Sequence, residues 1–254
     1  MFLVLDIGNT NISIGIFKER KLLYKTKIKT NKNFSFEKYY NLFNSILKKF
    51  LKEIKKVFIS SVYRPVNKKI EKVLKRLKLP EIKFLTINDF EKIIKIKVKQ
   101  KEKVGIDRLV NVTGGYLKIK KNIIVVDAGT ATTIDVIYKN GEFIGGIILP
   151  GIEMIMNSAC EKITVLKPVK IKKQKSVIGK NTDEAFLSGL YFGYFSAITG
   201  IIKMIKEELK TNFYVIGTGG AINYFKNEKI FDLIDLDFTI KSINEIILNS
   251  SNNF

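Results

Sequence analysis

The 254-residue chain contains no histidine. This absence excludes Ser/His and Cys/His nucleophilic catalysis and His-ligated metal sites, and it removes the side chain that most often transfers protons near neutral pH. Acid–base chemistry must therefore rest on carboxylates, lysine or tyrosine. Any bound metal is expected to be a hard cation held by oxygen atoms.

Cysteine and long apolar runs are also scarce. The single cysteine, Cys160, excludes an internal disulfide and suits a reducing compartment. We identify no apolar run of the roughly 18 residues needed to cross a bilayer. The start, MFLVLDIGNTN, lacks a basic segment and carries Asp6 within its apolar run, so it resembles a buried strand more than a signal peptide. The sequence predicts a cytoplasmic protein without a membrane segment.

Arginine is rare although the net charge is +21: the chain has 45 basic residues, and only Arg20, Arg64, Arg76 and Arg108 are arginines. Such a charge is compatible with nucleic-acid binding. However, base readout and bidentate phosphate contacts favour arginine, and the lysines are spread along the whole chain. We expect no nucleic-acid partner, while a DNA-binding regulator stays open as an alternative.

An internal duplication is the first positive feature. Residues 2–17 (FLVLDIGNTNISIGIF) align with residues 123–138 (IIVVDAGTATTIDVIY) at an offset of 121 throughout. In each copy we expect a strand, a polar turn, a second strand, a short turn and a third strand, near 22–28 and 143–149. Asn140-Gly141 in the last turn is a strong hairpin signal.

Helices alternate with strands after each of these meanders. Apolar spacing predicts helices near 36–54, 70–77, 185–209 and 243–248, and strands near 57–60 and 213–216. Asn67 is a candidate N-cap of the second helix. This alternation predicts an α/β fold with mixed sheets, divided into halves at 1–114 and 115–254 with a central cleft between them.

Two acidic-glycine turns are the main candidates for chemistry. In DIGNTN, Asp6 ends a strand, Gly8 lets the backbone turn, and short polar side chains follow; DAGTAT repeats this with Asp127, Gly129, Thr130 and Thr132. Such turns present backbone N–H groups to phosphate oxygens while the carboxylate holds a cation. One copy alone fits an ordinary Asx-rich turn better than a phosphate site. Both copies together favour a phosphate site.

Other glycine-containing segments are less specific. GTGG (217–220) follows a predicted strand and suits close approach of a flat ligand or simply a tight turn. GGIILPG (145–151) predicts a turn, and in NTDEAFLSG (181–189) Asn181 or Thr182 could cap the long helix or contact a substrate. No GxxxxGK[ST] sequence is present, which excludes P-loop chemistry.

VGIDRL (104–109) contains the candidate catalytic residue. Asp107 lies where a helix is expected to begin, so it is either an N-cap or, with no histidine available, the base for phosphoryl transfer to an alcohol. Arg108 beside it suits a carboxylate or a phosphate. The residues alone leave the two roles of Asp107 open.

Taken together, these motifs resemble those of type III pantothenate kinases. The segments DIGNTN, GIDR (105–108), DAGTATT (127–133), GGIILPG, NTDEAFLSG and TGG (218–220) occur in that family's order, and IDLDFTIKSI (234–243) is similar to its C-terminal strand and helix. The resemblance covers nearly the whole chain. It implies duplicated ribonuclease H-like domains of the actin-like type, within the acetate and sugar kinase, Hsc70 and actin superfamily.

The resemblance further implies an activity. Members of this family are homodimers that use MgATP, with potassium or ammonium as monovalent cation, to phosphorylate pantothenate at its primary hydroxyl. The product is 4'-phosphopantothenate, and the reaction is the first step of coenzyme A biosynthesis. A kinase of the same superfamily acting on a sugar or a carboxylic acid is the main alternative.

Site residues follow from the matching motifs. Asp107 would be the proton acceptor, Asp127 would bind the monovalent cation, and Asp6 would hold magnesium directly or through water. The resemblance places pantothenate at Gly105, Ile106, Asp107, Arg108 and Thr182. It places ATP at Asp6, Ile7, Gly8, Asn9, Thr10, Asn11, Ile12, Ser13 and Thr130. The family often has Tyr-x-x-Pro where this chain has Val98 and Lys101, and a valine cannot donate the hydrogen bond of the tyrosine hydroxyl to the substrate.

Overall fold

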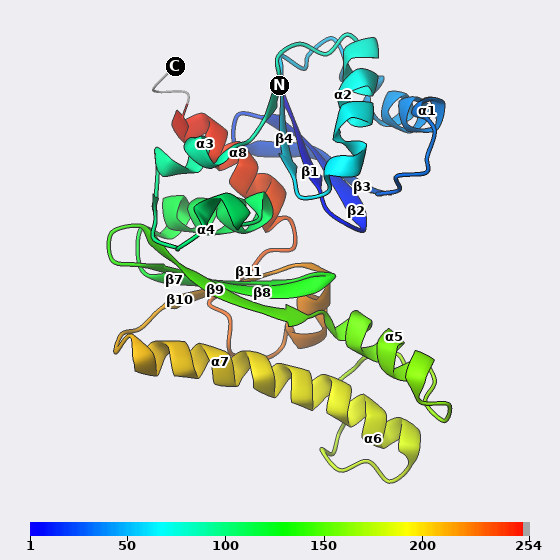
Figure 1. The fold of residues 1–254 in the computed structure, drawn as a ribbon, viewed down its shortest axis with the longest axis vertical. Coiled ribbons are helices and arrows are strands. Elements are labelled where there is room, and N and C mark those ends of the chain that lie inside the picture. The colour runs from blue at the N-terminus through cyan, green and yellow to red at the C-terminus, as the bar shows by residue number, and fades with distance from the viewer. Residues whose placement is uncertain (251–254) are drawn as a thin grey trace. The chain divides into compact units, whose positions relative to one another are not determined.

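The computed structural model describes residues 1–250 and divides them into two compact units. The first unit contains Met1–Lys118 and the described residues from Asp237 on, and the second contains Ile119–Leu236 (Figure 1). This division differs from halves at 1–114 and 115–254, because the chain returns to the first unit for its last helix. There α8 (Phe238–Ser250) packs on the strands β1 (Phe2–Ile7) and β2 (Asn11–Lys18).

The first unit is built on a mixed sheet of strand order β3-β2-β1-β4-β5. Its remaining strands are β3 (Lys21–Lys29), β4 (Lys56–Ser61) and β5 (Ile82–Phe84). β1 is antiparallel to β2 and parallel to β4. The unit's other elements are α1 (Phe36–Leu47), α2 (Asn67–Arg76), α3 (Ile87–Glu91), β6 (Lys95–Ile96) and α4 (Ile106–Ile119).

The second unit repeats this strand order. Within it the strands run β9-β8-β7-β10-β11, again with an antiparallel meander on one side and parallel strands on the other. They are β7 (Ile123–Ala128), β8 (Ala131–Tyr138), β9 (Glu142–Pro150), β10 (Tyr214–Thr218) and β11 (Leu233–Ile234). Two units with the same order confirm the predicted α/β fold of duplicated domains with mixed sheets.

The duplication is not uniform in register. An offset of 121 relates β1 to β7 and β3 to β9, but β2 and β8 differ by 120. The β-bulges in these strands, at Ile16/Phe17 and Val136/Ile137, also differ by 120. The prediction of a constant offset was therefore wrong for the second strand, because the first turn is one residue longer in the first copy and the second turn is one residue longer in the second copy.

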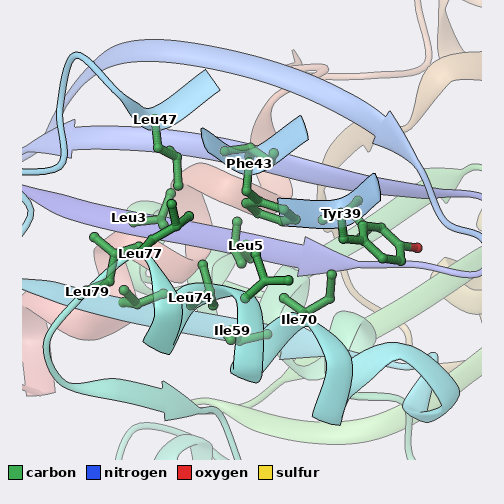
Figure 2. Packing of buried hydrophobic residues seen from close by; sticks show 14 of the residues in the cluster. Leu3, Leu5, Tyr39, Phe43, Leu47, Ile59, Ile70, Leu74, Leu77 and Leu79 are labelled. Atoms are coloured by element: carbon green, nitrogen blue, oxygen red, sulfur yellow. The ribbon is translucent and has the colours of Figure 1, made fainter. Parts of the chain in front are cut away.

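The core of the first unit lies between its sheet and the helices α1 and α2. Tyr39, Phe43 and Leu47 repeat on one face of α1 and belong to the same buried cluster as Leu3 and Leu5 of β1 (Figure 2). α2 contributes Ile70 and Leu74 to the same cluster, and Leu77 follows directly after this helix ends. Alternate residues of β1 fill this core. Asp6 consequently belongs to the opposite face of the sheet.

A single long helical segment covers one face of the second sheet. It consists of α6 (Thr182–Ser188), a π-helical stretch (Gly189–Gly193) and α7 (Tyr194–Glu208). Its core-facing residues include Ile198, Ile202 and Ile205. The hairpin between β8 and β9 contains Asn140 and Gly141 at positive φ, as its sequence predicts. α5 (Ile152–Lys162) follows β9.

The same helical segment shows that the expectation of no apolar stretch long enough to cross a bilayer was wrong. Thr182–Glu208 spans 27 residues, and its most apolar 18-residue window has a mean hydropathy of 1.5, which satisfies the length and composition of a membrane-crossing helix. About 39% of that window is buried inside the protein, and a core helix of a globular domain meets the same criteria.

Of two candidate N-caps, the structure contradicts Asn67 and confirms Asn181. Asn67 is not the N-cap of α2: Val66 holds that position, and the Asn67 side chain accepts a hydrogen bond of 2.7 Å from the Ser61 hydroxyl. Asn181 does cap α6, since its side-chain oxygen accepts from the Glu184 N–H at 2.9 Å. The last helix, α8, is longer than the predicted 243–248.

We predict that Gly114→Ala destabilises the first unit. Gly114 of α4 contacts α8, and a Cβ atom there would lie 2.8 Å from the Cα of Ser242, which real structures do not tolerate. Overpacking of this kind costs about 1–3 kcal/mol of unfolding free energy. Gly200→Ala in α7 is the matched control, because nothing lies within 4 Å of its added methyl group. Thermal unfolding should show a lower midpoint for Gly114→Ala only; equal midpoints would contradict the prediction.

Candidate active site

Asp6 lies between two hydroxyl side chains in the sheet of the first unit. The register pairs Asp6 with Ser13 of β2 on one side and with Ser60 of β4 on the other. Directly paired residues share a face of the sheet, so the three side chains form a row. The Ser60 hydroxyl is fully buried and donates to Asp6 Oδ1 at 3.0 Å. This bond fixes the carboxylate at the end of β1.

The turn after Asp6 is held by Thr30, a residue that sequence analysis missed. The Thr30 N–H donates to the Thr10 carbonyl at 2.9 Å, and its hydroxyl donates to the Gly8 carbonyl at 2.8 Å. Gly8 itself donates to the Asn11 carbonyl at 3.0 Å, which leaves Asn9 and Thr10 between the bonded ends. Thr30 therefore ties the end of β3 to the candidate phosphate turn.

Eight of the nine residues predicted to contact ATP form the segment 6–13, and they differ in exposure. Ile7 and Ile12 are fully buried in the core on the α1 and α2 side, so only their backbone could meet a ligand. Asn9, Thr10 and Asn11 are exposed, and Asp6, Gly8 and Ser13 are half-buried. The accessible part of the predicted segment is the turn itself together with the Asp6 face of the sheet.

The predicted substrate loop lies beside this turn in the same unit. Val62 follows β4 and donates its N–H to the Ile7 carbonyl at 3.0 Å. A Cβ atom on Gly105 would lie 3.7 Å from Val62 Cγ1 and 2.5 Å from Asp107 Oδ1. Gly105 thus lies against the residue that follows β4, next to the strand that carries Asp6, and its lack of a side chain leaves room for the Asp107 carboxylate.

Asp107 is the second residue of α4 rather than the residue before it. Its Oδ1 accepts from the N–H of Arg108 at 2.8 Å. An N-cap side chain would instead reach the N–H two or three residues further on. The carboxylate therefore stabilises its own first turn, and Ile106, Asp107 and Arg108 are all half-buried, within reach of a ligand.

The second unit contains the same hydroxyl–carboxylate–hydroxyl row. Asp127 pairs with Thr133 of β8 and with Thr218 of β10. Thr218 belongs to GTGG, so that segment supplies a neighbour of the carboxylate. The turn is shorter than in the first unit: Gly129 donates to the Ala131 carbonyl at 3.0 Å, and only Thr130 lies between them. The two turns thus have the same kind of glycine hydrogen bond and the same carboxylate row, but they differ in length by one residue.

Thr132 does not belong to this row. It pairs with Ala128, lies on the core face of β8 and is fully buried, where its hydroxyl is hydrogen-bonded to that of Tyr194. Burial raises the pKa of Tyr194 above its usual value. Sequence analysis grouped Thr132 with Asp127 and Gly129, and that grouping was wrong because strand residues alternate between faces.

Gly219 of GTGG has a conformation and surroundings that only glycine allows. It has a positive φ of 87°, and a Cβ atom there would lie 2.5 Å from both Asp127 Oδ1 and the Ala128 carbonyl oxygen. Any side chain would therefore fill the space beside these two oxygen atoms. A carboxylate and a carbonyl that converge on open space are the ligand types that hard cations prefer.

Thr182 is the remaining predicted contact. It is the exposed first residue of α6 in the second unit, after the Asn181 cap. The structure thus gathers Asp6, Ser13, Gly105 and Asp107 in the first unit, and it places Asp127, Thr130 and Thr182 in the second.

We predict that Thr30→Val loosens the turn at Gly8–Asn11. Valine keeps the shape of threonine but leaves the Gly8 carbonyl without its donor, which should lower the free energy of unfolding by about 1 kcal/mol. Amide hydrogen exchange at Gly8 should also become faster. Thr30→Ser, which keeps the hydroxyl, is the control and should behave like the parent protein. Unchanged exchange in Thr30→Val would show that the hydroxyl does not hold the turn.

Comparison with solved structures supports this fold. The chain aligns with a conserved Campylobacter jejuni protein assigned to the Baf family at a TM-score of 0.62, with 21% identity over 98% of this chain and 99% of that one. A ROK family protein from Streptococcus pneumoniae aligns at 0.52, with 11% identity over 100% and 99% of the two chains. At these identities the likeness concerns the fold alone, which is the actin-like type expected.

Sequence comparison is more specific. A protein named type III pantothenate kinase from Sulfurihydrogenibium sp. is 37% identical over 230 residues, which cover 87% of this chain and 88% of the relative. Another of that name, from Citrifermentans bemidjiense, is 32% identical over 97% of this chain and 95% of its own length. The family model described as type III pantothenate kinase matches residues 2–204. The chain belongs to the type III pantothenate kinase family.

Proposed function

We propose that the protein transfers the γ-phosphoryl group of ATP to the primary hydroxyl of pantothenate and forms 4'-phosphopantothenate, the first step of coenzyme A biosynthesis. Membership of the family carries the choice of substrate. One observation carries the chemistry: the loop with Asp107 lies at the carboxyl end of β4, beside the strand that carries Asp6. An acceptor alcohol and a phosphate chain would therefore meet at one edge of one sheet.

In this mechanism Asp107 accepts the proton of the alcohol as the phosphorus–oxygen bond forms. With no histidine in the chain, a carboxylate is the natural acceptor. Arg108, the next residue, orients the pantothenate carboxylate through its fork of N–H donors. The transition state of phosphoryl transfer is loose, so positioning and charge neutralisation account for most of the rate.

Magnesium bound with ATP would neutralise phosphate charge, and Asp6 would hold it directly or through water. The residues fit this role: Asp6 Oδ1 already has one donor in Ser60, and hard oxygen ligands suit magnesium. In the described part of the chain no group of three or more Asp, Glu, Cys or His side chains comes together. A site with one carboxylate, completed by phosphate and water oxygens, is a usual form for magnesium in kinases.

The second acidic turn fits a monovalent cation, potassium or ammonium. Asp127 Oδ1 and the Ala128 carbonyl converge on the space that Gly219 keeps open. Thr130 of the same turn would contact ATP, as its counterparts Asn9 and Thr10 would in the first unit. A cation at Asp127 would offset part of the charge of a nucleotide bound at Thr130.

We also propose that the protein is a cytoplasmic homodimer. The second unit carries an apolar cavity of about 450 Å³, lined by residues such as Leu149, Ile155, Phe186 and Tyr194. α5 beside it exposes further apolar side chains, Met154 at 46% and Ile155 at 38% exposure. Such a patch is typical of an interface, and α6 beside it begins with Thr182. Thr182 would then contact pantothenate across the dimer.

Turnover of ATP with pantothenate tests the proposal directly. We expect ADP release that depends on pantothenate and increases with potassium or ammonium relative to sodium. Asp107→Asn should reduce kcat by about 10²- to 10⁴-fold while leaving pantothenate binding, measured by calorimetry, nearly unchanged. Because the amide can still accept from the Arg108 N–H, α4 should keep its start.

Three other outcomes of these measurements would contradict the proposal. Near-normal kcat in Asp107→Asn would remove this residue from the base role. No response to pantothenate, but ADP release with a sugar or a carboxylic acid, would indicate another kinase of the superfamily. Retention of DNA at 0.2 M salt without turnover of any acceptor would favour a regulator that binds through its lysines.

The homodimer gives a separate prediction. Ile155→Lys places a charge at the apolar cavity, so sedimentation should show monomers with an unchanged circular dichroism spectrum. Leu23→Lys on β3 is the control: both residues are 38% exposed, but Leu23 lies in the first unit. A dimeric Ile155→Lys protein would exclude this face as the interface, and a monomeric parent protein would exclude the dimer.

A further inference from the structure

The edge strand β3 carries lysines on one face beside the candidate phosphate turn. Residues alternate between the faces of a strand, so Lys25, Lys27 and Lys29 point to the same side while Ile28 packs toward the core. The face is that of Asp6, because Lys27 pairs with Ser13 and Ser13 pairs with Asp6. Three positive charges thus line the side of the sheet on which the phosphates would bind.

The helix α8 covers only part of this face. Lys25 forms an ion pair of 2.5 Å with Asp237, the residue before α8. A Cβ atom on Gly15, the partner of Lys25 in β2, would lie 3.3 Å from Ile240 of α8. Lys27 lies two residues further toward the turn and is exposed. Among the described residues no ion pair is found for Lys27.

Lys27 extends the row that contains Asp6. Across the sheet the register runs Lys27, Ser13, Asp6 and Ser60. Neighbouring strands lie about 4.8 Å apart, so the Cα atoms of Lys27 and Asp6 are separated by about 10 Å. Five bonds of about 1.5 Å let the lysine side chain extend roughly 6 Å, far enough to meet a phosphate bound above Asp6 and Ser13. Lys29 instead pairs with Asn11, beyond the end of β1.

The second unit has no lysine at the position that corresponds to Lys27. There the corresponding row runs Ile148, Thr133, Asp127 and Thr218. The carboxylate and both hydroxyl neighbours recur, while the place of Lys27 is taken by an isoleucine that is 61% exposed. The two rows therefore differ in charge at one end. A triphosphate chain carries several negative charges and is repelled by Asp6 unless cations offset it.

We propose that Lys27 binds the phosphate chain of the nucleotide at the row formed by Asp6, Ser13 and Ser60. The proposal rests on the proposed function only in taking ATP as the phosphate ligand. Lysine acts here as a flexible point charge, as in other phosphate sites. Lysines on edge strands also prevent strand pairing between molecules, and that role would apply equally to Lys21 at the far end of β3.

Nucleotide binding to Lys27→Gln tests the proposal. Titration calorimetry with MgATP and with adenosine should show about tenfold weaker binding of MgATP and unchanged binding of adenosine, since a hydrogen bond to a charged group is lost. Lys27→Arg should recover most of the affinity. Lys21→Gln removes the same charge six residues away and should bind MgATP like the parent protein, which controls for the overall charge.

Three outcomes would overturn the proposal. Equal MgATP affinity in Lys27→Gln and the parent protein would show that the lysine does not touch the phosphates. An equal loss in Lys21→Gln would show a general effect of charge. A parallel loss of adenosine binding would show structural damage rather than a lost phosphate contact. Since none of these measurements uses pantothenate, they remain decisive even if the acceptor is a different alcohol.

Discussion

The pairing of the first strand of each unit with a neighbour on both sides is the constraint on which the site depends. In the first unit this pairing sets Asp6 between Ser13 and Ser60, and in the second it sets Asp127 between Thr133 and Thr218. A shift of one residue in either register would move the carboxylate into the apolar core. The buried residues on the other face, such as Leu5 and Ile7, prevent that shift. The core of each unit thus fixes the position of its acidic group.

Glycines then set the space around these rows. Gly105 leaves room for the Asp107 carboxylate, and Gly219 keeps open the space beside Asp127 and the Ala128 carbonyl. In both places a methyl group would collide with the carboxylate oxygen that is expected to act. The absence of a side chain is therefore as much a part of the site as the acidic residues are.

Much of the fold could be predicted from the sequence because strand alternation, helical spacing and the Asn-Gly hairpin are local signals. The duplication was visible, and so were Asp6, Asp107 and Asp127. Ser60 and Thr30 were missed because their roles depend on contacts 54 and 22 residues away in the chain. Thr132 was assigned to the face of Asp127 by mistake. The first turn of the second copy is one residue shorter than that of the first copy, and an alignment at a constant offset conceals that difference. The roles assigned to the individual site residues remain predictions.

The return of α8 to the first unit has a consequence for how the protein is made. The second unit is one continuous stretch, Ile119–Leu236, so all of it has been synthesised before α8 exists. The first unit lacks until then the helix that packs on β1 and fits against Gly114. During vectorial synthesis the part of the chain that emerges first is therefore the part that is completed last. The face of the first sheet that α8 later covers is therefore exposed to solvent while the second unit folds.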